Sequence, residues 1–336
     1  MKLPKSPPQP PRAEAPTRRE MLTRVGLSAG ALATAAAVAR WRWDHGGFAQ
    51  HEAQGERQVR DFRIKDDAGP LDMAVVRNGT PEQLVEAALT AMGGMSRFVS
   101  RGDVVAIKPN IGWDQSPLKA ANTNPQVVAA VVKACFVAGA KTVVVTDASC
   151  NDPARCFQRS GIWNAAYEMG ADVILPSEHR FRTLRLRGDV LDEWPVYMPL
   201  INADKVINLP IAKHHNLAKY TAAMKNWYGV LGGRRTRLHQ NIDTSIADLA
   251  TFMRPTLTIV DAVRVLMRNG PQGGSFDDAR QADTLIASID QVAADAYGCT
   301  LIGQKRENLA YLAKADERGI GTSKWESLRV REIDLA

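Results

Sequence analysis

Short runs of β-branched residues alternate with longer helical segments along most of this chain, and this alternation constrains its fold most strongly. Continuous Val and Ile runs are typical of strands that are buried on both faces of a sheet. The pattern predicts an α/β domain over residues 70–336, with a mostly parallel sheet and helices on both faces in a single large domain. The predicted strands cover residues 71–77, 103–110, 141–147, 171–176, 204–210, 256–261 and 284–290.

Helix start signals lie between several of these strands. Thr80, Pro81 and Gln83 form a capping-box pattern, and Asn124-Pro125 opens a helix that Gly139 ends. We expect a further helix to end near Met169. Residues 40–69 show no sustained period, which predicts an extended lead-in before the domain.

The N-terminal residues carry the pattern of an export signal. The twin arginine Arg18-Arg19 precedes an uncharged, mildly apolar run (25–39) that ends in an A-x-A triplet at Ala39. This pattern predicts export to the periplasm by the twin-arginine translocation machinery, with cleavage near Ala39. An uncleaved membrane tether stays open as the alternative, although the run is shorter than the roughly 20 strongly apolar residues that span a bilayer.

The charge of the chain argues against nucleic acid as a partner. The formal net charge is +7, of which the six basic and two acidic residues of 1–39 carry +4. The remaining chain, near +3, does not have the charge that is typical of proteins that bind nucleic acid or anionic membranes.

Polar side chains follow most of the predicted strands. In a parallel sheet, ligands bind beyond the carboxyl ends of the strands, so these side chains predict a site at that edge. The aspartates could orient a His or Lys or bind a hard cation, or could simply cap the next helix. The residues at the strand ends are Lys108, Asn110, Asp147, Lys213, His215, Asp261 and Asp290.

The stretch AKHHNLAKYTAAMKNWYG (212–229) combines histidines, lysines and an aromatic pair. We expect it to lead into a helix in which Lys225 and Asn226 face a ligand and Trp227-Tyr228 seal them in. Together with Lys108 and Lys213, these residues predict an anion site, since ammonium groups bind phosphates, carboxylates and oxyanions. For Lys219 and the arginine run 234–237, a solvated basic face is the favoured interpretation.

The four cysteines fall into two groups. Cys135 and Cys299 lie in apolar helical patterns and are interpreted as core residues. Cys150 and Cys156 lie in a polar loop, where a disulfide, a metal or iron-sulfur site completed by His215 and His239, or two free thiols are all open.

The order of motifs along the chain resembles the domain of unknown function 362 family over about residues 70–303. The resemblance implies an α/β domain and a link to iron-sulfur and redox contexts, because many relatives carry ferredoxin-type cysteine clusters; this chain has no C-x2-C-x2-C run, so it lacks the ligands of such a cluster. The motifs are IKPN, GAKTVVVTDAS, VINLPIAKHH, AAMKNWYGV, LTIVDAV, NGPQGG and IASIDQVAADAYG. The family-like polar residues are Lys108, Asn110, Asp147, Lys213, His215, Lys225, Asn226, His239, Asp261, Asp290 and Asp295.

Three classes of function follow from these patterns. The first is a periplasmic redox or metal-binding protein that uses Cys150, Cys156 and histidine and has a redox partner. The second is an enzyme that acts on an anionic small molecule, with His215 or His239 as acid or base and the lysines as electrostatic stabilisers, beside Asp147. The third is a carrier that binds a ligand or metal reversibly without turnover.

Overall fold

The computed structural model describes residues 17–19, 21, 59–64 and 69–336. The chain divides into two compact units, Met1–Arg57 and Gln58–Ala336, and the second contains the sheet. Most of the predicted export signal, including the run 25–39 and Ala39, lies outside the described residues. Within the described residues, none of the helices combines the length and the apolar character that crossing a membrane would require.

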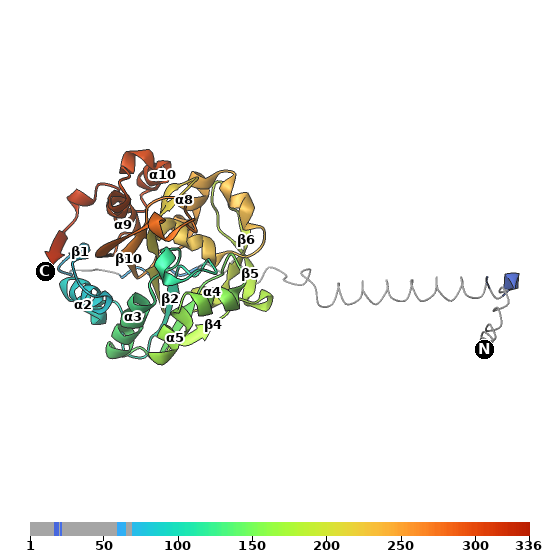
Figure 1. Ribbon diagram of the computed structural model, residues 1–336, viewed down its shortest axis with the longest axis horizontal. Coiled ribbons are helices and arrows are strands. Elements are labelled where there is room, and N and C mark those ends of the chain that lie inside the picture. The colour runs from blue at the N-terminus through green and yellow to red at the C-terminus, as the bar shows by residue number, and fades with distance from the viewer. Residues whose placement is uncertain (1–16, 20, 22–58, 65–68) are drawn as a thin grey trace, which may run out of the picture. The chain divides into compact units, whose positions relative to one another are not determined.

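In the described part of the chain, ten strands form one mixed sheet that is mostly parallel, as the sequence predicts (Figure 1). β11 runs antiparallel to β1 and β10, whereas the pairs on either side of these strands are parallel. A hairpin of β8 (Ile211–His215) and β9 (Lys219–Thr221) extends from β10. The order of the other strands is β12 (Val330–Asp334), β1 (Met73–Arg77), β11 (Ala279–Ser288), β10 (Leu257–Leu266), β7 (Lys205–Leu209), β2 (Val104–Pro109), β3 (Thr142–Thr146) and β4 (Asp172–Ile174).

Helices cover both faces of this sheet (Figure 1). Successive strand residues point to opposite faces, so that Val75 packs in one core and Val76 in the other. The first face carries α2 (Pro81–Ala91), α3 (Pro125–Val137), α4 (Pro153–Arg159) and α5 (Ile162–Glu168). The second face carries α6 (Met198–Ile201), α7 (Ala223–Asn226), α8 (Ile242–Phe252), α9 (Gln291–Gly298) and α10 (Ala310–Glu317).

Shorter elements complete the domain. A separate two-stranded sheet joins β5 (Phe181–Arg185) to β6 (Glu193–Tyr197). Single turns of 3-10 helix connect many elements, at Met95–Arg97, Pro117–Lys119, Glu178–Arg180, Trp227–Val230, Arg235–His239, Phe276–Asp278, Cys299–Ile302, Arg306–Asn308 and Trp325–Ser327.

The predicted helix starts are confirmed. Thr80 and Gln83 exchange both hydrogen bonds of a capping box at α2. Asn124 accepts a hydrogen bond from the backbone N–H of Gln126 and so caps α3, which Pro125 begins. Phe62, which the sequence places in the lead-in, packs into the core and is 3% exposed.

The helix expected around Lys225 and Asn226 is present but short, and a hairpin that the sequence analysis did not predict precedes it. The structure forms the β8–β9 hairpin first, and α7 contains only Ala223–Asn226 before a turn of 3-10 helix. The hairpin pairs Lys213 with Thr221 and His215 with Lys219. Strand pairing therefore sets the backbone conformation of the residues before α7.

Candidate functional site

A buried ion pair lies at the carboxyl ends of β2 and β3. Lys108 Nζ lies 2.7 Å from Asp147 Oδ1, and the two side chains are 0% and 3% exposed. Lys108 also donates to Pro109 O and to Asn226 Oδ1, both at 3.0 Å. Burial lowers the pKa of Lys108, while the negative charge of Asp147 opposes that shift.

Asn226 connects the ion pair to the neighbouring strands. Its Nδ2 donates to Lys108 O at 3.0 Å and to Asn208 Oδ1 at 2.8 Å, and its Oδ1 accepts from Asn110 Nδ2 at 3.2 Å. Asn208 in turn donates to Ala223 O at 2.9 Å. These bonds fix α7 against the ends of β2 and β7.

Lys213 is a buried cation. Among the described residues, no carboxylate lies within ion-pair distance of it. It projects from β8, is 2% exposed, and donates to Asn110 Oδ1 at 3.0 Å and to Ala121 O at 2.5 Å. Burial and the charge of Lys225 lower the pKa of Lys213 to about 7. An ammonium held by neutral oxygens alone leaves its positive charge available to an anion.

Lys225 supplies the third cation of the cluster. It is half-buried, and its ammonium lies 4.3 Å from the centroid of the Tyr228 ring. Burial lowers its pKa to about 8, and the charge of Arg235 adds to that shift. The negative charge of Asp147 acts on Lys108 and Lys213, and within the described residues Lys225 has no carboxylate at ion-pair distance.

Two histidines stack beside these lysines. The ring centroids of His215 and His239 are 5.9 Å apart and the two rings are nearly parallel. The rings of Tyr228 and His239 pack edge to face, with their centroids 5.4 Å apart. His215 Nδ1 accepts backbone hydrogen bonds from Leu217 and Ala218, each at 3.2 Å, so its proton resides on Nε2.

The protonation states of the histidines follow from burial and from the adjacent cations. Burial and the charge of Lys225 lower the pKa of His215 to about 2, so His215 is neutral and presents Nε2–H as a donor. Burial also lowers the pKa of His239, although hydrogen bonds to the main chain of Arg235 and Thr236 oppose the shift. The pKa of His239 is thus shifted in the same direction as that of His215, with two hydrogen bonds opposing the shift.

Arg235 holds a loop of the site. Its guanidinium donates to Ala148 O at 2.6 Å and also to Ser149 O. The sequence analysis placed the arginine run 234–237 on a solvated face, which holds for Arg234 and Arg237 and is wrong for half-buried Arg235.

Gly229 packs directly on the buried ion pair. A Cβ atom at this position would lie 1.9 Å from Asp147 Oδ1 and 2.8 Å from Lys108 Nζ. Its carbonyl oxygen accepts the backbone hydrogen bond of Ala148 at 3.0 Å. The glycine in the WYGV motif is therefore required by the approach of this backbone to the two charged side chains.

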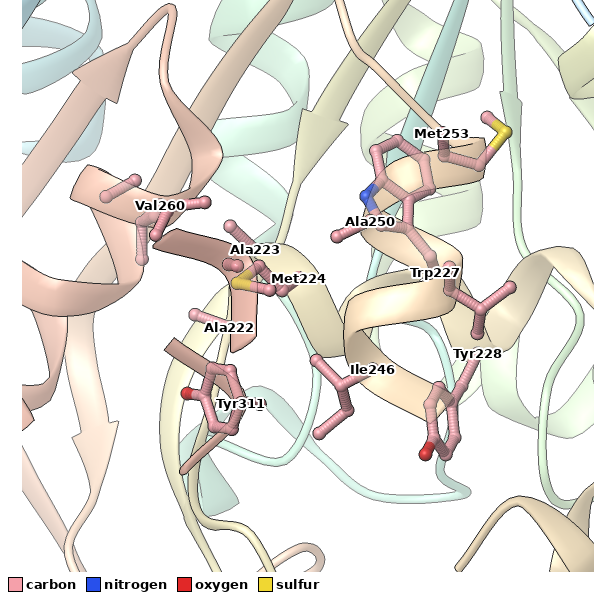
Figure 2. Close-up of a cluster of buried hydrophobic side chains, with 14 of the residues drawn as sticks. Ala222, Ala223, Met224, Trp227, Tyr228, Ile246, Ala250, Met253, Val260 and Tyr311 are labelled. Carbon is pink, nitrogen blue, oxygen red and sulfur yellow. The ribbon is translucent and has the colours of Figure 1, made fainter. Parts of the chain in front are cut away.

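Buried aromatic and aliphatic side chains pack around α7 and the turn that follows it. Figure 2 shows Met224, Trp227 and Tyr228 among buried side chains that include Ile246 and Ala250 of α8. The indole N–H of Trp227 donates to Gln291 Oε1 at 2.7 Å. Both aromatic side chains are therefore buried in the core, and their role in sealing a ligand stays a prediction.

The structure does not assemble the predicted metal site. In residues 59–64 and 69–336, no three His, Cys, Asp or Glu side chains are grouped so that they could hold a metal ion. Cys150 and Cys156 are both free, so the disulfide alternative is not formed. Cys156 is buried on α4 and burial raises the pKa of its thiol to about 11, while His215 Nδ1 is already occupied. These residues do not fit a transition metal or an iron-sulfur cluster.

Two predicted ligand residues, Asp290 and Asp261, have structural roles: Asp290 lies away from the lysines, and Asp261 accepts hydrogen bonds from backbone N–H groups. Asp290 is misplaced by the sequence analysis because β11 runs antiparallel, so its carboxyl end lies at the opposite edge of the sheet, where Asp290 caps α9. Asp261 accepts backbone hydrogen bonds from Asn124 at 2.7 Å and Val263 at 3.0 Å. Burial raises its pKa to about 6.

The sequence analysis did not single out Asn208 or Arg235 as members of this site. Asn208 is a fully buried amide within an otherwise apolar strand, VINLP, which is the signal that could have identified it. Arg235 had no such signal, because its neighbours in the sequence are exposed.

Comparison with known proteins identifies the family. The family described as Domain of unknown function (DUF362) matches residues 105–300. The chain belongs to this family. The DUF362 resemblance read from the motifs is therefore confirmed, and the family description assigns no activity.

Two individual proteins are also similar to this DUF362 chain. The thylakoid-associated protein sll1697 of Synechocystis sp. is 27% identical over 215 residues, which cover 62% of this chain and 65% of that protein's length. The lactate racemase apoprotein of Thermoanaerobacterium thermosaccharolyticum aligns with a TM-score of 0.37 and 12% identity, over 72% of this chain and 58% of that one. A structural likeness at this level supports no statement about function.

Proposed function

We propose that this protein binds a small anionic molecule among Lys108, Lys213 and Lys225 and acts on it as an enzyme by proton transfer. The observation that carries the proposal is the convergence of three lysines of which, among the described residues, only Lys108 has a carboxylate at ion-pair distance, that of Asp147. Buried cations without matching carboxylates bind anions because the ligand supplies the missing negative charge.

The histidines give the proposed site its chemistry. Neutral His215 donates a hydrogen bond through Nε2 to an oxygen of the bound anion, where it stabilises developing negative charge. His239 accepts or returns a proton, since its pKa is lowered and it lies stacked on His215. Lys213, with a pKa of about 7, is a second group able to exchange a proton at neutral pH.

The redox or metal function predicted from the cysteines has less support, because the four proposed ligands do not form a metal-binding group in the described residues. A carrier without turnover would use the same lysines. Product formation from a bound anion separates the enzyme from the carrier, and reversible recovery of unchanged ligand would favour the carrier.

Calorimetric titration with inorganic phosphate and with malonate tests the binding step. We expect Lys213→Met to weaken binding of the better anion at least about tenfold, since a hydrogen bond to a charged group contributes roughly 1.5–3 kcal/mol. The matched control is Lys141→Met, because Lys141 is exposed and lies at the start of β3, at the opposite edge of the sheet.

The pH dependence of binding gives a second test. Affinity should fall as pH rises through 7 to 8, because Lys213 and Lys225 lose their protons in that range. Equal affinities in the two lysine variants, or an affinity independent of pH, would contradict the proposal.

We also propose that the protein reaches the periplasm by the twin-arginine machinery. Arg18-Arg19 and the uncharged run 25–39 support this. N-terminal sequencing of the exported protein tests it. An N-terminus near Arg40 supports cleavage, and an intact Met1 in the membrane fraction supports tethering. Export that is unchanged after Arg18→Lys and Arg19→Lys would argue against the route.

A further inference from the structure

Cys150 is the exposed cysteine beside the lysine cluster. The other three cysteines, Cys135, Cys156 and Cys299, are each 0% exposed. The Cys150 thiol lies close enough to Lys108, Lys213 and Lys225 to interact electrostatically with all three. A reagent that reaches this thiol must therefore enter the field of the same three cations.

The loop that carries Cys150 is fixed on both sides. Cys150 N–H donates to Gly112 O at 2.9 Å, and the Arg235 guanidinium holds the two preceding carbonyl groups, of Ala148 and Ser149. The thiol therefore keeps its position relative to the lysines.

Gly112 lies between the thiol and the polar network. A Cβ atom there would lie 3.9 Å from Cys150 Sγ and 3.8 Å from Asn110 Oδ1, the oxygen that accepts from Lys213. Lys213 is itself 2% exposed and has no carboxylate at ion-pair distance in the described residues. The exposed sulfur and the amide oxygen that accepts from the buried ammonium group thus flank the same glycine.

We propose that Cys150 exchanges with small anionic disulfides, which the lysine cluster draws to it. In this step the Cys150 thiol gives its proton to solvent, and its sulfur attacks one sulfur of the disulfide. A new S–S bond forms, the original S–S bond breaks, and the leaving thiolate takes the bonding electron pair. The small disulfide is the oxidant, and a second small thiol reverses the step.

This exchange rests on the proposed anion site and would regulate the binding of anions there. The carboxylate of the attached group would lie among Lys213 and Lys225, in place of a free anion. Anion binding is thereby blocked until the mixed disulfide is reduced.

Reaction rates with disulfides of opposite charge test this inference. The probes are the dianionic dithiobis(nitrobenzoate) and the dicationic cystamine, and the reference is a synthetic peptide of residues 145–154, which contains Cys150. We expect the ratio of anionic to cationic rates to be at least about tenfold higher for the protein than for the peptide at low salt. At about 1 M salt, where the Debye length is roughly 3 Å, the two ratios should converge.

Variants assign the effect to these residues. Cys150→Ser should abolish labelling, as peptide mass spectrometry would show, and Lys213→Met should lower the rate ratio while Lys141→Met preserves it. A protein ratio equal to the peptide ratio, or labelling that persists in Cys150→Ser, would overturn the inference. Phosphate binding by the Cys150→Ser protein is measured separately: it reports on the proposed function alone, so the failure of one proposal is distinguishable from failure of the other.

Discussion

Replacing Asp147 with Asn should destabilise the protein strongly. The Lys108–Asp147 pair spans 2.7 Å with side chains 0% and 3% exposed, and Lys108 is the partner of Asp147 Oδ1 in the described residues. The variant leaves Lys108 buried without a counter-charge, which typically costs about 3–5 kcal/mol of unfolding free energy. The matched control is Glu82→Gln, because the Lys133–Glu82 pair has a similar distance of 2.8 Å but side chains 60% and 65% exposed. The loss of stability in Glu82→Gln should be much smaller, because solvent screens an exposed ion pair.

Urea denaturation followed by tryptophan fluorescence measures both variants. A second change, Lys108→Met, should restore most of the stability lost in Asp147→Asn, because it removes the unpaired charge. The pH dependence has a defined sign: burial lowers the pKa of Lys108, so the folded state binds fewer protons than the unfolded state and stability of Asp147→Asn rises with pH toward about 10. Losses for Asp147→Asn and Glu82→Gln that agree within about 1 kcal/mol would refute the buried-pair account.

Two further changes probe the support of the site. Gly229→Ala should lower the unfolding free energy by about 1–3 kcal/mol, because its Cβ would lie 1.9 Å from Asp147 Oδ1; unchanged stability in urea would contradict this packing. Asp295 accepts hydrogen bonds from the backbone of Ala223 and Met224, and burial raises its pKa to about 7. The folded state therefore binds more protons than the unfolded state between about pH 4 and 7, so wild type should lose as much as about 4 kcal/mol relative to Asp295→Asn over that range, and parallel pH profiles would show the assignment to be wrong.

The central part of the fold was predictable because its signals are local. Val and Ile runs such as 141–147 identify strands buried on both faces, and Asn124-Pro125 defines the start of α3 by capping. The β8–β9 hairpin was missed because its strands are short and rich in Lys and His, and because their partners are set by pairing with β10 and with each other. Strand direction is not encoded locally either, which is why Asp290 was assigned to the wrong edge.

The candidate site was predictable in part for the same reason. Lys108, Asn110, Asp147, Lys213 and Asn226 follow strands or interrupt apolar patterns, and the structure joins them by hydrogen bonds and ion pairs. The metal site expected from Cys156 and the histidines is not formed, because α4 buries the Cys156 thiol in the core. Cysteine spacing alone carries no information about the side of a helix that packs inward.

The pKa values of Lys213 and Lys225 test the central claim most directly. Lysines labelled with carbon-13 at the ε position can be titrated by NMR and assigned with Lys213→Met and Lys225→Met. We expect titration near pH 7 for Lys213 and near pH 8 for Lys225, with both values rising when inorganic phosphate is added. Titration of both lysines near their ordinary value of about 10.4, unchanged by phosphate, would contradict a buried cation cluster that binds anions.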